Sequence, residues 1–263
     1  MNDLKTTVIQ SDLYWEQPDA NLAMFEEKIW KIDQPTDVIV LPEMFSTGFT
    51  MNVKNMAEPM HSRTYRWMAQ MARQTKAVVM GSYIVQDGAA YYNRFMAVRP
   101  DGSYEKYDKR HLFGLAGEDK DLSPGTGRSI IEVKGWKILP LICYDLRFPV
   151  WSRSVRMDQQ LYEYEVVMYV ASWPKPRIHS WDTLLKARAV ENIAYSIGVN
   201  RIGQDANGYE YVGHSAVYDF LGQPLTELHE EAGMATTTLS WDMLQTFRDR
   251  FPFQADADRF SLD

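Results

Sequence analysis

The one cysteine of the chain, Cys143, ends an apolar run and precedes a polar, turn-prone segment, in the string Pro140-Leu141-Ile142-Cys143-Tyr144-Asp145-Leu146-Arg147-Phe148-Pro149. This pattern predicts that the thiol lies at the carboxyl end of a strand, where open α/β sheets carry their chemistry. A lone cysteine forms no intramolecular disulfide, so it is either a small apolar filler or a nucleophile. Position alone favours the filler, and the nucleophile hypothesis therefore needs support from other residues.

A glutamate follows a second strand that reads as buried on both faces. The segment Asp37–Leu41 contains four consecutive apolar residues, and Pro42, which has no N–H to donate, ends the strand just before Glu43. Aromatic residues follow, so we expect the carboxyl group to be partly buried, which favours its protonated form. Such a group can serve as a general base. The alternative is a glutamate that caps a loop or pairs with a structural arginine.

A lysine lies in a basic segment in the middle of the chain, Tyr107-Asp108-Lys109-Arg110-His111-Leu112-Phe113. The segment follows the turn Arg99-Pro100-Asp101-Gly102, which closes a hairpin after the strand Tyr92–Val98. For an isolated lysine the usual interpretation is a solvated charge. Beside a thiol, an ammonium group would instead stabilise a thiolate and a developing oxyanion.

Together, these three segments resemble the nitrilase superfamily of carbon–nitrogen hydrolases. Its members carry a glutamate after an early strand, a lysine in a mid-chain loop and a cysteine at a later strand end, which here match Glu43, Lys109 and Cys143. The resemblance continues through Ala171–Pro174, Trp181–Asn192 and Asn200–Ser215 and covers nearly the whole chain. The strings around Lys109 and Cys143 are most similar to the omega-amidase subgroup.

The resemblance implies a fold and a mechanism. The fold is α/β, a four-layer α-β-β-α sandwich in which two mixed sheets pack face to face with helices outside. Cys143 would be the nucleophile, and Glu43 would take the thiol proton and return it to the leaving amine. Lys109 and the backbone N–H of Tyr144 would stabilise the oxyanion.

The resemblance also points to further site residues. Glu118 matches a second family glutamate that positions substrate or contacts the lysine; the alternative is an acidic surface loop that includes Asp119 and Asp121. Trp173 and Phe113 are candidates for the pocket wall, as is Phe45. Ordinary packing is the alternative for these aromatic residues.

Arg147 is expected to be structural, buried against an acidic partner behind the nucleophile, for which Asp145 is the candidate. A different arginine is the candidate for binding a substrate carboxylate. Arg177 ends the segment Trp173-Pro174-Lys175-Pro176-Arg177, which places two cations just past the strand next to the nucleophile strand, and a guanidinium group can bind a carboxylate through two hydrogen bonds. The alternatives are a solvated loop charge at Arg177, or binding by Lys175, Arg110 or Arg201.

Hydrophobic patterning predicts a layered α/β arrangement. Helical stripes begin near Asp19, a candidate N-cap, and near Tyr65 and Trp181. Ten segments read as strands, with a hairpin turning at Lys134-Gly135: Thr6–Ser11, Asp37–Leu41, Ala77–Ile84, Tyr92–Val98, Ile130–Val133, Trp136–Cys143, Val166–Ala171, Ala194–Asn200, Ser215–Asp219 and Ala235–Leu239.

Composition restricts the function classes. The chain has 263 residues with a net charge of −7, which argues against nucleic-acid binding, and it has no apolar run long enough to span a bilayer. No spacing of His, Cys or acidic residues suggests a metal site, and the expected chemistry needs no cofactor.

With motifs spread from residue 43 to residue 215, we expect one domain, 1–263, with 241–263 as an interface or packing tail. The lone thiol and the lack of an export signal at the start of the sequence favour the cytoplasm, and the family resemblance implies a homodimer.

The first hypothesis for function is therefore a cofactor-free amidohydrolase. The subgroup resemblance implies release of ammonia from the terminal amide of 2-oxoglutaramate or 2-oxosuccinamate through a cysteine thioester. An N-carbamoyl amino acid amidohydrolase or another carbon–nitrogen hydrolase is the alternative within the family, and a nitrilase proper is less favoured. The alternative from another class is a non-catalytic binding module.

Overall fold

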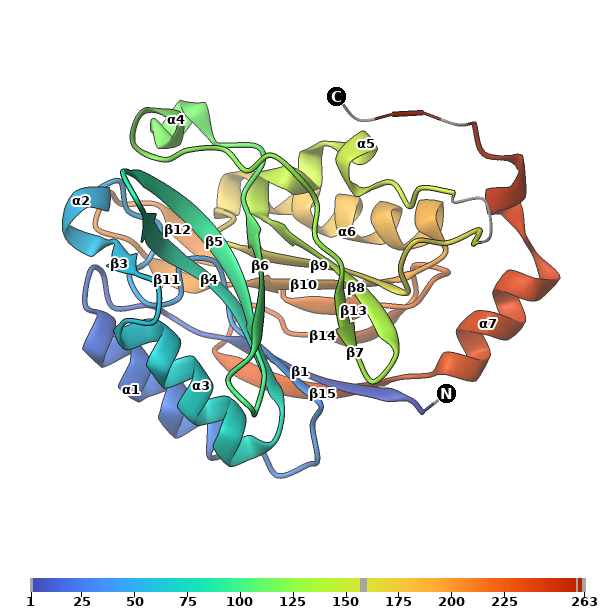
Figure 1. The fold of residues 1–263 in the computed structure, drawn as a ribbon, viewed down its shortest axis with the longest axis horizontal. Helices are drawn as coiled ribbons and strands as arrows, with labels where there is room; N and C mark the ends of the chain where they lie inside the picture. Colours follow the sequence, from blue (N-terminus) through green and yellow to red (C-terminus); the bar gives the residue numbers. More distant parts are fainter. Residues whose placement is uncertain (1, 157–159, 259, 262–263) are drawn as a thin grey trace.

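A computed structural model describes residues 2–156, 160–258 and 260–261. Two β-sheets pack face to face at its centre, and helices cover both outer faces (Figure 1). This arrangement is the four-layer α/β sandwich that the sequence predicted. No helix within the described ranges is long and apolar enough to cross a bilayer.

The first sheet has the strand order β15-β1-β2-β4-β5-β6, with β3 paired to β4. Its strands are β1 (Leu4–Gln10), β2 (Val38–Val40), β3 (Glu58–Pro59), β4 (Val78–Asp87), β5 (Ala90–Val98), β6 (Tyr104–Asp108) and β15 (Gly233–Leu239). Alternation along β2 explains its two-sided burial, because Val38 and Val40 face the core between the sheets while Ile39 packs with the outer helices. Those helices are α1 (Pro18–Ile29) and α3 (Arg63–Thr75).

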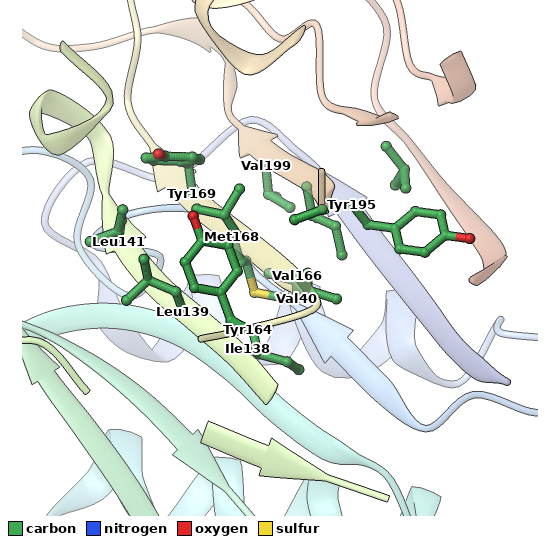
Figure 2. Packing of buried hydrophobic residues seen from close by; sticks show 14 of the residues in the cluster. Val40, Ile138, Leu139, Leu141, Tyr164, Val166, Met168, Tyr169, Tyr195 and Val199 are labelled. Atoms are coloured by element: carbon green, nitrogen blue, oxygen red, sulfur yellow. The ribbon is translucent and has the colours of Figure 1, made fainter. Parts of the chain in front are cut away.

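The second sheet has the order β14-β13-β10-β9-β8-β7. Its strands are β7 (Ile131–Val133), β8 (Trp136–Ile142), β9 (Val166–Ala171), β10 (Tyr195–Asn200), β13 (Ala216–Tyr218) and β14 (Pro224–Glu227). Helix α6 (Ile178–Asn192) lies on its outer face. A glycine allows this close approach, because a Cβ on Gly198 of β10 would lie 2.4 Å from Leu185 Cδ1 of α6. Figure 2 shows the apolar side chains that fill the core around β8, β9 and β10.

The remaining elements are short or lie at the end of the chain. They are α2 (Val53–Met56), η1 (Gly114–Ala116), α4 (Glu118–Asp121), η2 (Cys143–Arg147), α5 (Pro149–Ser152), η3 (Lys175–Arg177), β11 (Ile202–Gln204), β12 (Glu210–Val212), α7 (Trp241–Arg250) and η4 (Phe253–Asp256). Elements α2, α4 and the β11–β12 hairpin gather at one end of the sandwich, at the upper left in Figure 1.

All ten predicted strands are present, and the hairpin at Lys134-Gly135 joins β7 to β8. Both turn residues have positive φ, 54° and 86°, as a tight hairpin turn requires. The predicted N-cap was wrong: α1 begins after Gln17, and Asp19 lies inside the first turn without capping a backbone N–H. Pro18 at the helix start explains the shift, because its fixed φ suits the first helical position.

Candidate active site

Cys143 lies directly after β8, where the strand turns into η2. Its φ is 44°, a left-handed conformation that is strained for a residue with a side chain. Asp145 holds this turn in place, because its Oδ2 accepts hydrogen bonds from Ile142 N at 3.0 Å and from Tyr107 Oη at 2.8 Å. The thiol therefore points away from the strand, a geometry also found where a strand turns sharply into a helix at a nucleophile.

The predicted partnership between Asp145 and Arg147 was wrong. Asp145 is fully buried and its Oδ1 accepts the backbone N–H of His111 at 3.0 Å. Arg147 is exposed, donates to Ser180 Oγ at 3.0 Å, and lies with Cζ 4.9 Å from the ring centroid of Trp173. The two side chains leave the short 3₁₀ turn in different directions, so one points behind the nucleophile and the other toward the cavity.

Glu43 follows β2 and is 0% exposed. Its Oε1 accepts hydrogen bonds from Lys109 Nζ at 2.9 Å and Asn93 Nδ2 at 2.8 Å, and its Oε2 accepts the N–H of Ser172 at 2.8 Å. The next residue, Met44, has a φ of 45° and donates its N–H to Ser82 Oγ. The expectation of burial is confirmed. The expected preference for the protonated form is opposed by these three donors, all of which favour the ionised carboxylate.

Lys109 lies just past β6 and is also 0% exposed, so the solvated-charge alternative was wrong. Its Nζ bridges Glu43 Oε1 at 2.9 Å and Glu118 Oε2 at 2.9 Å. Burial alone would lower the pKa of Lys109, but the negative charges of Glu118 and Glu43 raise it above the usual lysine range. The ammonium therefore stays charged in the buried site.

Glu118 begins α4 and is 0% exposed, whereas Asp119 and Asp121 beside it are exposed. The acidic surface loop is thus a correct description of those two neighbours and not of Glu118. Its Oε2 accepts the N–H of Phe113 at 2.6 Å, which ties α4 to the lysine loop. Burial raises the pKa of Glu118, and the ion pair with Lys109 opposes that rise.

The Cys143 thiol lies beside this buried cluster. Burial raises the pKa of Cys143 well above its usual range, the nearby charge of Glu43 adds to the rise, and Lys109 opposes it. The raised pKa favours the protonated thiol at rest, so a nucleophilic role for Cys143 requires a base that removes its proton.

Asn93, on β5, was missed by the sequence analysis. Its Nδ2 donates to Glu43 Oε1 at 2.8 Å and to Glu118 Oε1 at 3.2 Å, and its backbone O accepts the N–H of Lys109 at 3.0 Å. The available signal was strand alternation. Asn93 shares a face with Phe95 and Ala97, which lie in the core between the sheets, so a polar residue there needed an explanation.

A cavity of about 910 Å³ opens above the thiol. Lys109 and Cys143 line it together with three of the predicted substrate-contacting residues, Tyr144, Phe113 and Trp173. Phe45 was a wrong candidate, because it packs in the core against Phe25 and Trp67. The β11–β12 hairpin supplies a wall that the sequence did not predict, with Asp205, Tyr209 and Tyr211.

Two arginines line the cavity, Arg177 and Arg147. Arg177 lies with Cζ 5.2 Å from the ring centroid of Phe113, and neither guanidinium group forms an ion pair within the described part of the chain. The other candidate cations are engaged elsewhere: Lys175 pairs with Glu210 at 2.8 Å, Arg201 with Asp12 at 2.9 Å, and Arg110 donates to Gly125 O.

Comparison with known proteins agrees with this arrangement. A model of the carbon–nitrogen hydrolase family matches residues 5–249. The chain belongs to this family. Omega-amidase YafV of Yersinia enterocolitica is 44% identical over 263 residues, which is 100% of both chains. A 2-oxoglutaramate amidase of Bacillus subtilis is 32% identical over 247 residues, 93% of each chain.

A solved structure extends the agreement to the fold. A carbon–nitrogen hydrolase superfamily protein of Xanthomonas campestris, which carries an arsenic adduct in its active site, superposes with a TM-score of 0.97 and 38% identity over 100% of both chains. In the present carbon–nitrogen hydrolase, the residues that the structure describes contain no group of three or more His, Cys, Asp or Glu placed to hold a metal ion.

Proposed function

We propose that this carbon–nitrogen hydrolase releases ammonia from the terminal amide of a small carboxylate substrate, 2-oxoglutaramate or 2-oxosuccinamate. The observation that carries the proposal is a thiol, Cys143, at the floor of a cavity with buried Glu43 and Lys109 beside it and two arginines in its wall. Two relatives similar over nearly their whole length are named as an omega-amidase and a 2-oxoglutaramate amidase, which supports this substrate class.

In the first half-reaction, the sulfur of Cys143 bonds to the amide carbon while the thiol proton moves to Glu43. The carbonyl π electrons move onto the oxygen, and Lys109 and the backbone N–H of Tyr144 stabilise the resulting oxyanion. When the tetrahedral intermediate collapses, the C–N bond breaks and Glu43 returns its proton to the leaving nitrogen. The products of this half-reaction are ammonia and a thioester on Cys143.

The second half-reaction consumes water. Glu43, now ionised again, removes a proton from a water molecule as its oxygen bonds to the thioester carbon. The second intermediate collapses with cleavage of the C–S bond, and the leaving sulfur recovers the proton from Glu43. The free acid departs and the site returns to its starting state with no external reductant, oxidant or cofactor.

Glu118 keeps the ammonium of Lys109 in place throughout, because both of its oxygens accept from Nζ, at 3.0 and 2.9 Å. The substrate carboxylate binds to Arg177 and Arg147. Two guanidinium groups at the cavity wall can neutralise a carboxylate with charge-assisted hydrogen bonds. Stacking on Phe113 and Trp173 holds each of them over an aromatic face.

The protein acts as a homodimer in the cytoplasm under this proposal. The apolar residues Val150, Val190 and Phe253 are exposed. Hydrogen bonds from Arg153 to Glu191 O and Gln254 connect the three segments that carry them, which supports a shared apolar contact surface. A free nucleophilic thiol suits a reducing compartment. Light scattering during size-exclusion chromatography measures the assembly, and a mass of one chain would contradict the dimer.

An ammonia-release assay tests the substrate. The panel contains 2-oxoglutaramate, 2-oxosuccinamate, N-carbamoyl amino acids, a nitrile of matching length and an uncharged amide of similar size. We expect the highest kcat/KM for the two 2-oxo amides. Preference for a carbamoyl compound would support the other family activity, and preference for the uncharged amide would overturn the carboxylate specificity.

A further inference from the structure

Two side chains, Lys109 and Asn93, each donate hydrogen bonds to both the Glu43 and the Glu118 carboxylates. Lys109 Nζ donates to Glu43 Oε1 and Glu118 Oε1, at 2.9 and 3.0 Å, and Asn93 Nδ2 donates to the same two oxygens at 2.8 and 3.2 Å. All four residues are 0% exposed. The lysine brings a positive charge to the pair. The asparagine brings two hydrogens and no charge.

This difference matters because two carboxylates share one cation. Like-charged carboxyl groups held this close in a buried site tend to take up a shared proton. A proton held there would occupy the base that must accept the thiol proton. A second cation in place of Asn93 would prevent this proton uptake. It would also cancel the negative charge of the cluster and so favour the thiolate of Cys143 in the resting site.

We propose that Asn93 is a positioning residue that keeps Glu43 ionised and available as the base by donating both amide hydrogens to the two facing carboxylates. This inference rests on the proposed function, in which Glu43 removes the thiol proton. The backbone of Asn93 is fixed in position, because its strand β5 pairs with β4 on one side and β6 on the other, and its backbone O accepts a hydrogen bond from Lys109 N.

The titratable groups around Glu43 come from several elements. They are Lys109 after β6, Glu118 on α4 and the Cys143 thiol on η2, and Tyr211 of β12 lines the same cavity as the thiol. Strand β9 is followed by Ser172, which contributes a backbone N–H. Among the described residues, Asn93 is the only neutral side chain that donates to the Glu43 carboxylate.

The reactive form has the proton moved from Cys143 to Glu43, so it carries as many protons as the resting form. As the pH is lowered, reactivity therefore stays constant until the cluster takes up one more proton. At lower pH than this, reactivity decreases. Asn93→Leu keeps the side-chain shape and removes both donors. We expect the acid midpoint of kcat/KM to rise by about one to two pH units, the usual effect of losing a hydrogen bond to a charged acceptor.

Alkylation of Cys143 by iodoacetamide gives a readout that needs no amide hydrolysis, and its acid midpoint should move by the same amount. Asn93→Ser, which retains one donor hydrogen, should move both midpoints less and serves if the leucine variant does not fold. Ser82→Ala is the matched control. It removes the hydroxyl that accepts the N–H of Met44, next to Glu43, and leaves both carboxylates with their donors, so its acid midpoint should match that of the wild type.

A loss of rate or stability in the Asn93 variants with an unchanged acid midpoint would overturn the inference, since a merely structural role predicts that result. A shift of equal size in Ser82→Ala would overturn it as well. If the wild type hydrolyses no amide, the proposed function fails, while the alkylation profiles still decide the role of Asn93.

Discussion

At the scale of single residues, the candidate site holds one more acidic side chain than basic side chains. Glu43 and Glu118 contribute two carboxylates, Lys109 contributes one ammonium, and all three are buried. That excess charge and burial together keep the Cys143 thiol protonated at rest. Under the proposed mechanism the thiolate forms only in the course of attack, which limits oxidation and alkylation of the enzyme when no substrate is bound.

The ultraviolet absorbance of the thiolate reports this ionisation directly. An ordinary thiol is half ionised at about pH 8.5, and the raised pKa of Cys143 should leave it protonated there. Glu43→Gln removes a negative charge and should lower the pKa, while Lys109→Met removes the opposing positive charge and should raise it further. Half-titration of the wild type at or below pH 8.5, or a shift of both variants in the same direction, would contradict the charge arrangement.

Asn93 and Arg147 mark the limits of sequence reasoning at this scale. Glu43, Lys109 and Cys143 were predicted as site residues by type and segment, and the structure places their side chains near one another. Glu118 was predicted as a partner of Lys109, but Asn93 and Ser172 were not identified as partners of Glu43, because contacts such as Ser172 N to Glu43 join residues 129 positions apart. Arg147 was misassigned because sequence spacing of two residues in a 3₁₀ turn does not reveal which side chain faces the cavity.

At the scale of elements, strand ends set the site. Glu43 follows β2 of one sheet, and Cys143 and Ser172 follow β8 and β9 of the other. Short segments then complete the cavity: α4 brings Glu118, η3 brings Arg177 and the β11–β12 hairpin brings Tyr211. Strands were predictable because apolar runs and turn residues are local signals. The short elements β11, β12 and α4 were not predicted, because their residues form neither an apolar run nor a clear hydrophobic period.

The arginines of the cavity wall give a prediction for η3 and η2. Arg177→Ala and Arg147→Ala should each raise KM for 2-oxoglutaramate by about 10-fold to 100-fold, the loss expected for a charge-assisted hydrogen bond. KM for an uncharged amide of similar size should change little. Lys175→Ala is the control on the same loop, because Lys175 pairs with Glu210 at the surface and should leave both KM values unchanged. Equal effects on the two substrates would remove that arginine from carboxylate binding.

At the scale of the whole molecule, two sheets with parallel central strands place their carboxyl ends at one end of the sandwich, and the helices outside fix the sheets. The family resemblance implied this architecture, while periodicity alone reached only a mixed α/β arrangement. The C-terminal helix α7 is tied to the second sheet by Arg248, whose side chain donates to Ile193 O at 2.9 Å and Tyr164 O at 2.7 Å and pairs with Glu165 at 3.2 Å.

Arg248→Met tests whether this tail is part of the stable fold. The variant leaves Glu165 and two backbone carbonyls without their buried donor, and loss of one partner of a buried ion pair costs about 3–5 kcal/mol. For a chain of this size, Tm should fall by about 6 °C or more. Arg250→Met, an exposed position on the same helix, should leave Tm near the wild-type value. Equal Tm values for the two variants would show that the tail contributes little.

The most direct test of the central claim is the covalent state of Cys143 during turnover. Mass spectrometry of the enzyme, quenched in acid during reaction with 2-oxoglutaramate, should show one added acyl group, and digestion should locate it on the peptide that carries Cys143. The Cys143→Ala variant should fold, gain no mass and release no ammonia. An acyl group on another residue, or ammonia release by the alanine variant at a rate near that of the wild type, would contradict the assignment of Cys143 as the nucleophile.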